Sequence, residues 1–149
     1  MHAVSWATGG APELSDADVA AALEAALSHG ARPGIGLEVV FVDAETLRRM
    51  HAEVLDDPTE TDVITFDLGE GPGPAGELYV SVDRARTVAA KRGVTLAREL
   101  TLYLVHGALH LCGYDDHEEE DRRAMRDAER EVMGTLGFEA DDAPHEYGL

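Results

Sequence analysis

This 149-residue chain has only one cysteine, few basic residues and no long apolar run. The single thiol, Cys112, excludes an internal disulfide and favours a reducing, cytoplasmic compartment. No apolar run approaches the roughly 18 residues of a membrane span, and residues 1–6 lack the basic flank and apolar core of a signal peptide. We therefore expect a soluble cytoplasmic protein that has no membrane partner.

Positive charge is scarce, because 12 basic residues stand against 30 acidic ones and the formal net charge is −18. This balance argues against a broad basic surface that would bind nucleic acid by neutralising its phosphates. Much of the acid lies in two blocks, 115–121 and 139–146, so a local basic groove elsewhere is compatible with the sequence.

The pattern along the chain predicts one domain over residues 1–138 and a disordered acidic tail over 139–149. Segments that alternate or are rich in β-branched residues predict strands at 2–6, 37–42, 61–66 and 77–82. Helical spacing and capping residues predict helices that begin after Ser15, Asp43, Asp83 and Thr95, and a final helix that ends at Gly137.

Burial can be predicted for two of these helices. The segment from Leu100 to Leu111 is apolar nearly all round, so this helix should be the central, buried one. In the helix after Asp43, the spacing of Leu47, Met50 and Val54 predicts that all three face the core. His51 has no partner in the sequence and is expected at the surface.

The end of the central helix carries a dense set of side chains that can bind metal. His106 and His110 are four residues apart, so their imidazoles share one helix face and can bind one ion. Gly113 then lets the chain leave the helix and return a third ligand from the segment 115–117. The alternative is a buried histidine that is hydrogen bonded to a backbone carbonyl.

Two histidines and one returning ligand leave a coordination position open, and an open zinc position lowers the pKa of water to about 7. This arrangement predicts hydrolysis with one zinc ion, although imidazole also suits nickel, copper and iron. Gly107 stands where the peptidase pattern H-E-x-x-H has its general base, so a zincin peptidase is disfavoured. Gly107 permits either close approach of substrate or tight helix packing.

The motif His106-Gly107-x-Leu109-His110-Leu111-x-Gly113-Tyr114-Asp115 resembles the signature of the YbeY family of endoribonucleases. Residues 61–66 and 76–80 are similar to the family's T-D-V-L-S-F and G-D-I-x-I strands, and the resemblance covers residues 37–137. It implies an α+β, zincin-like fold, in which a small mixed sheet packs with helices around a central buried metal-binding helix.

The same resemblance implies a function for a domain of this kind. A zinc ion on three protein ligands would support cleavage of single-stranded RNA, including 3′-end maturation of 16S ribosomal RNA, and a part in ribosome quality control. The implied partners are RNA and the ribosome or its small-subunit proteins. Basic residues between the third strand and the central helix could line the RNA cleft; they are Arg84, Arg86, Lys91, Arg92 and Arg98.

The third ligand departs from the family pattern. The family's third histidine lies ten residues after the first, where this chain has Asp116, and His117 follows one residue later. A carboxylate is an adequate zinc ligand, so we predict His106, His110 and Asp116 as the metal ligands and keep His117 as the alternative to Asp116. Asp115 and Asp62 are candidates for accepting a proton during catalysis, and Asp115 could instead cap or orient the site.

A second departure is Leu55. It aligns with an arginine that many family members carry before the strand predicted at 61–66. That arginine is thought to act on the substrate, and leucine cannot bind phosphate. An alternative function is therefore a non-catalytic, ribosome-associated factor whose zinc is structural.

Overall fold

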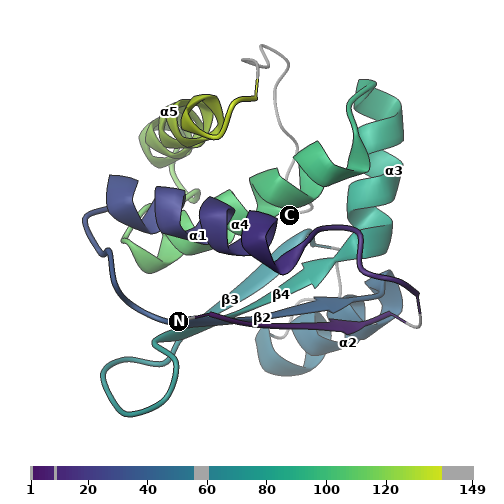
Figure 1. Cartoon of the computed structure of the whole chain (residues 1–149), viewed down its shortest axis with the longest axis horizontal. Coiled ribbons are helices and arrows are strands. Elements are labelled where there is room, and N and C mark those ends of the chain that lie inside the picture. Colours follow the sequence, from purple (N-terminus) through teal and green to yellow (C-terminus); the bar gives the residue numbers. More distant parts are fainter. Residues whose placement is uncertain (1, 9, 56–60, 139–149) are drawn as a thin grey trace.

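The computed structural model describes residues 2–8, 10–55 and 61–138, and within them helices pack on both faces of a four-stranded sheet (Figure 1). The strands are β1 (Ala3–Ala7), β2 (Leu37–Val42), β3 (Val63–Asp67) and β4 (Gly76–Ser81). The helices are α1 (Asp16–His29), α2 (Ala44–Leu55), α3 (Val82–Arg92), α4 (Leu96–Leu111) and α5 (Glu119–Thr135). The predicted α+β fold is confirmed.

The sheet is mixed and has the strand order β1-β2-β4-β3. The first three strands in that order are parallel, and β3 is antiparallel to β4, with Val63 opposite Val80 and Asp67 opposite Gly76. The predicted strands occur within one or two residues of their expected bounds. The largest difference is in β3, whose pairing with β4 starts at Val63, so Thr61 and Asp62 precede the strand.

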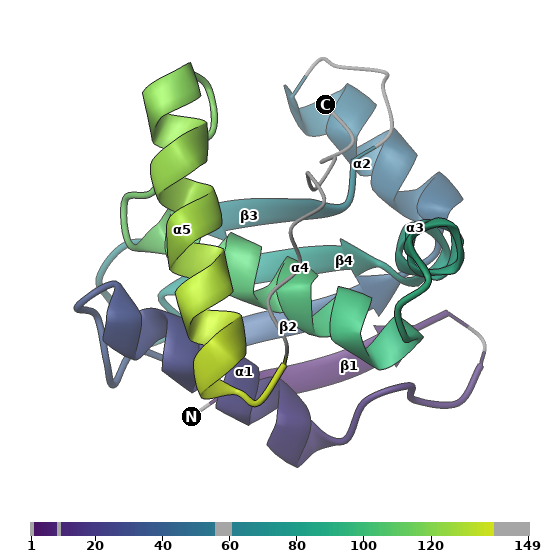
Figure 2. The same ribbon diagram turned by 90° about the horizontal axis from the view of Figure 1, so that it is seen from above.

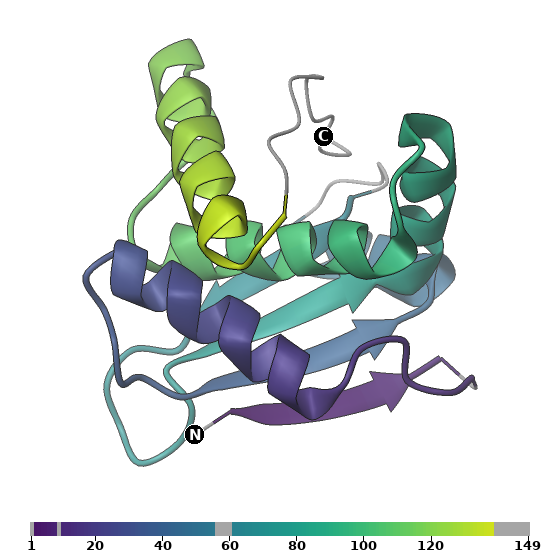
Figure 3. The same ribbon diagram turned by 45° about the horizontal axis from the view of Figure 1, so that its top comes forward.

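The two faces of the sheet are covered differently. Alternate residues of β2 such as Val39 and Phe41 enter the large core, which the sheet shares with α1, α4 and α5. The opposite face is covered by α2 through a smaller cluster of Val42, Leu47 and Ile64. Figures 1 and 3 show α1, α4 and α5 together on one side of the sheet, and Figure 1 shows α2 on the other.

Helix α4 is the central buried element, as its apolar sequence predicts. Every residue from Glu99 to Leu109 is buried. The helix begins at the predicted cap, where the Thr95 side chain accepts a hydrogen bond from the backbone N–H of Arg98. A helix held on so many sides is a rigid support for side chains at its C-terminal end.

Three local predictions are wrong, those for the cap of α3 and for the burial of Val54 and His51, and a tertiary contact explains the first. Ser81, not Asp83, caps α3, because Asp83 instead accepts a hydrogen bond from the Ala44 N–H and caps α2 at 2.9 Å. Val54 is 55% exposed, whereas His51 is 4% exposed. The buried row of α2 therefore continues from Leu47 to His51 and stops short of Val54.

In the part of the chain that the structure describes, no helix combines the length and apolar character needed to cross a bilayer. The predicted tail, 139–149, lies outside the described residues.

Candidate metal centre

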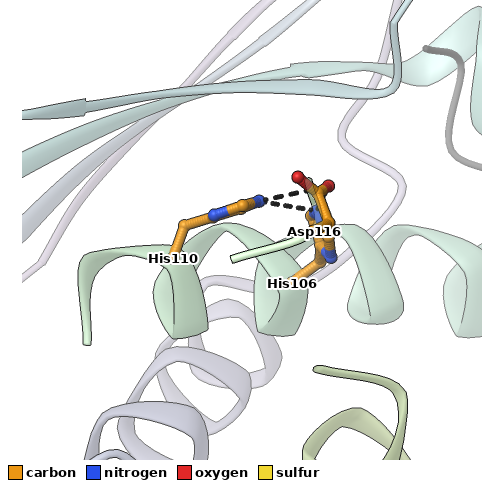
Figure 4. Close-up of side chains that lie close together, drawn as sticks. All are labelled: His106, His110 and Asp116. Carbon is orange, nitrogen blue, oxygen red and sulfur yellow. Dashed lines mark hydrogen bonds and ion pairs between the residues drawn. The ribbon is translucent and has the colours of Figure 1, made fainter. Parts of the chain in front are cut away.

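Two histidines from α4 and one aspartate from the following loop meet at a single point (Figure 4). His106 Nε2 lies 3.0 Å from His110 Nε2, and each of these atoms lies 3.5 Å from Asp116 Oδ2. His106 and Asp116 are buried, whereas the His110 side chain keeps 27% of its surface exposed. The three side chains form a candidate metal site whose open side is at His110.

The loop that delivers Asp116 is held by backbone contacts at the end of α4. Gly113 adopts φ +100°, which a side chain would strain, and its N–H donates to the His110 carbonyl at 3.0 Å. The Asp116 N–H donates to Asp115 Oδ1 at 2.7 Å, and Arg122 donates to the carbonyl of His117 at 2.9 Å. These bonds return the chain toward the histidine pair.

Glu129 on α5 is a site residue that sequence reasoning missed. Its Oε2 lies 2.6 Å from His106 Nδ1, and its side chain is 5% exposed. A carboxylate here accepts a hydrogen bond from His106 Nδ1–H, so in the neutral ring the Nε2 lone pair points toward His110 and Asp116. The available signal was an acidic residue on the buried side of an amphipathic helix, next to Met125, Ala128 and Val132.

The electrostatics of the site follow from these contacts. Burial disfavours a charged His106, but hydrogen bonds to Asp116 and Glu129 and the charges of both carboxylates outweigh it and raise the pKa of His106 to about 9. Hydrogen bonds from His106 and His110 hold the pKa of Asp116 far below its usual range. Without a metal the site keeps a proton on His106 at neutral pH, and a bound cation would replace that proton.

The residues present fit a zinc ion. Ligand atoms about 2.0–2.1 Å from a tetrahedral zinc lie about 3.3 Å from one another. The observed separations of 3.0, 3.5 and 3.5 Å among His106, His110 and Asp116 bracket that value. Two imidazoles and a carboxylate are also a donor set that zinc accepts, and the carboxylate on His106 Nδ1 is the usual support of such a ligand.

The alternative third ligand, His117, lies away from this group. Its side chain is 80% exposed and its Nε2 is 3.4 Å from Asp115 Oδ1. Asp115, Asp116 and His117 form a second group of residue types that can bind metal, but Asp115 and His117 are exposed. The structure thus brings Asp116, and not His117, to the histidine pair.

Asp62 and two residues of the predicted basic cleft form ion pairs that do not include the three residues of the metal site. Asp62, 1% exposed, accepts a hydrogen bond from Arg84 at 2.9 Å. Arg92 similarly contacts the fully buried Glu99 at 3.3 Å. Two of the five predicted cleft residues are therefore committed to internal carboxylates.

Gly107 faces the sheet. A Cβ at this position would lie 2.7 Å from Leu78 Cδ2 and 3.2 Å from Thr65 Oγ1, and Leu78 is fully buried. Of the two interpretations of this glycine, the geometry favours tight packing of α4 on β3 and β4. Leu55, the other departure from the family pattern, ends α2, and its side chain lies outside the described part.

Comparison with known proteins agrees with this geometry. The family model described as Endoribonuclease YbeY matches residues 11–137. Endoribonuclease YbeY of Bacillus cytotoxicus is 36% identical over 127 residues, which are 77% of this chain and 81% of the relative. The Bacillus licheniformis protein of the same name is 35% identical over 88% of this chain and 91% of its own length. The Chlorobium luteolum protein is 34% identical over 83% of this chain and 90% of its own length.

Among solved structures, the solution structure of TM1509 from Thermotoga maritima has a TM-score of 0.58 and covers 98% of this chain and 100% of that one. At 22% identity it supports the fold alone. The family match, in contrast, runs from the segment before α1 to the end of α5 and includes the buried helix and the loop that carry the site. On that evidence the chain belongs to the YbeY endoribonuclease family.

Proposed function

We propose that this chain is a zinc-dependent endoribonuclease that cleaves single-stranded RNA and acts in 3′-end maturation of 16S ribosomal RNA and in ribosome quality control. The observation that carries the proposal is the convergence of His106, His110 and Asp116 within 3.0–3.5 Å at the end of a rigid helix. Family membership supports RNA as the substrate, because the relatives are named endoribonucleases.

One zinc ion would be held by His106 Nε2, His110 Nε2 and Asp116 Oδ2. When bound, zinc supplies Lewis-acid polarisation of a phosphodiester oxygen or of water. Glu129 holds the Nδ1–H of His106 and so keeps its Nε2 lone pair free for the ion. The scissile phosphate approaches from the side of His110, because His110 is the most exposed of the three side chains.

Asp115 is the better placed of the two predicted proton acceptors. It adjoins Asp116 in sequence, and its side chain is 47% exposed. Asp62 is buried against Arg84, so its carboxylate is committed to that guanidinium. We therefore assign the proton-accepting role to Asp115 and a structural role to Asp62.

A chain of net charge −18 needs help to hold RNA. We assign that help to the ribosome or its small-subunit proteins, in the cytoplasm, where a lone thiol stays reduced. Ribosomal partners would add affinity to the RNA contacts that the chain itself makes.

The test is cleavage of a single-stranded RNA by wild type, by metal-depleted protein and by the His110→Ala variant. We expect turnover from wild type alone, with recovery when zinc is returned to the depleted protein. The exposed neighbour His117→Ala is the matched control and should retain activity. Equal cleavage by metal-depleted and zinc-loaded protein would overturn the proposal.

A second candidate function rests on Leu55, which replaces the family's arginine. Under this alternative the chain is a ribosome-associated factor whose zinc only stabilises the end of α4. It predicts that wild type co-sediments with ribosomal subunits and cleaves no RNA, and that Leu55→Arg creates cleavage activity. Turnover by wild type rejects the alternative.

A further inference from the structure

Helix α5 carries an unusual concentration of positive charge. Four of the chain's 12 basic residues, Arg122, Arg123, Arg126 and Arg130, lie within 122–130. Together with Glu119 and Asp127 they line a shallow surface pocket of ≈ 260 Å³. The surface of a strongly acidic protein thus contains one pocket where arginines outnumber acidic residues by four to two.

Three of these arginines form a row, which we call the α5 arginine stripe: Arg122, Arg126 and Arg130. Each is four residues after the previous one, so successive side chains are about 6 Å apart along the helix and turned by only about 40°. All three side chains are exposed. The stripe is therefore a continuous, solvent-facing row on one side of α5.

The stripe begins at the metal centre. Arg122 Nη1 donates to the carbonyls of Asp116 at 3.4 Å and His117 at 2.9 Å, on the loop that supplies the third ligand. Glu129, which contacts His106, follows Arg122 by seven residues and Arg126 by three, so this buried side chain borders the stripe on the side of α5 that faces α4. Figure 2 shows α5 passing over α4, the helix that carries the two histidines.

The stripe is more accessible than Arg84 and Arg92, because its three side chains are exposed whereas those of Arg84 and Arg92 are 25% and 13% exposed and contact buried carboxylates. Arg123, beside the stripe, contacts Glu119 at 3.5 Å, but both side chains are more than 70% exposed and such pairs are weak. Arg130 makes no ion pair within the described ranges. Guanidinium groups in this setting can exchange a weak surface contact for a bidentate contact with phosphate.

We infer that the α5 arginine stripe binds the phosphate backbone of single-stranded RNA and leads the strand to the metal centre. The inference rests on the proposed function and adds the path of the substrate. It gives the RNA a different path from the cleft predicted from Arg84, Arg86, Lys91, Arg92 and Arg98. Two of those five, Arg84 and Arg92, contact Asp62 and Glu99. Contact through phosphates makes binding insensitive to base sequence and sensitive to salt.

The experiment measures binding of a fluorescent single-stranded oligouridylate to the full chain by anisotropy, at several salt concentrations and with zinc present. The test variant is Arg126→Gln with Arg130→Gln. Loss of two phosphate contacts should weaken binding and reduce the slope of log K against log salt by about 1.4, at about 0.7 for each contact. Arg130→Gln alone is a second variant, in case the first fails to fold, and should reduce the slope by about 0.7.

The matched control is Arg48→Gln with Arg49→Gln on α2, which removes the same charge from the opposite side of the sheet (Figure 1). We expect this control to bind RNA like wild type. Equal binding and equal salt slopes for the α5 and α2 variants would overturn the inference. So would a wild-type protein that binds no RNA, or an α5 variant whose only loss is affinity for a ribosomal protein.

Cleavage kinetics separate this inference from the proposed function. The α5 variant should raise KM several-fold with little change in kcat, whereas His110→Ala should abolish kcat. If wild type binds RNA through the stripe in a salt-dependent way but cleaves none, the inference about the stripe is supported and the proposed nuclease function is rejected. Turnover with a KM unchanged in the α5 variant would support the nuclease and reject the stripe.

Discussion

Glu129 Oε2 lies 2.6 Å from His106 Nδ1 and joins α5 to α4 at the candidate metal centre. Both side chains are at most 5% exposed, so the bond is made away from water. It makes the orientation of a ligand on one helix depend on the docking of another helix.

Glu129→Ala should weaken zinc binding by about 10–100-fold, because it frees the His106 ring to rotate and leaves its buried Nδ1–H without an acceptor. Glu131→Ala, whose side chain is 73% exposed on the same helix, is the control and should bind zinc like wild type. Competition with a chromophoric chelator measures both affinities. Equal affinities would mean that Glu129 does not support the ligand.

Asp116→Ala should lose most of its bound zinc, whereas His117→Ala should retain it. The reason is position: Asp116 Oδ2 lies 3.5 Å from both ligand nitrogens, and the His117 side chain is 80% exposed. Metal content per chain after gel filtration, measured by atomic emission, decides between them. The reverse pattern would make His117 the third ligand.

Gly107→Ala should destabilise the protein by about 1–3 kcal/mol, because the new methyl group would lie 2.7 Å from Leu78 Cδ2 in a filled core. Gly134→Ala is the matched control, since a Cβ there meets nothing within 4 Å and alanine favours the helix by up to about 1 kcal/mol. Urea unfolding measures both free energies. A neutral Gly107→Ala would show that α4 has room to move from the sheet.

The metal-free protein should lose stability as the pH rises from about 6.5 to 9. Folding raises the pKa of His106 from 6.5 to about 9, so its contribution is complete below 6.5 and disappears as pH passes the folded value. The pKa of Asp116 is lowered from 3.8, so its contribution changes only in acid and is constant across this range.

Urea unfolding of metal-free wild type and His106→Gln at several pH values between 6 and 9.5 measures this effect. The variant should show a flatter profile in this window, because it lacks the titrating imidazole. Zinc affinity of wild type should rise over the same window, since the ion displaces the His106 proton. A wild-type profile parallel to that of the variant would contradict the assignment to His106.

Much of the fold follows from local sequence. Ser15 and Thr95 cap their helices as predicted, because a side-chain oxygen and an N–H three residues away meet by local geometry alone. Asp83 shows the limit of such reasoning. Its carboxylate accepts a hydrogen bond from the N–H of Ala44 on α2, 39 residues away, and not from an N–H of its own helix. Distant partners are chosen by packing, which no local pattern contains.

The same division applies to the site. The sequence by itself determined that His106 and His110 share one face of a buried helix, because a four-residue step on a helix has only one geometry. Only the tertiary structure decided that Asp116 turns inward while His117 faces water, that Glu129 supports His106, and that the arginines of α5 begin beside the metal ligands. Those outcomes depend on how the loop after Gly113 closes and how α5 docks on α4, which are long-range contacts fixed by burial of the whole core.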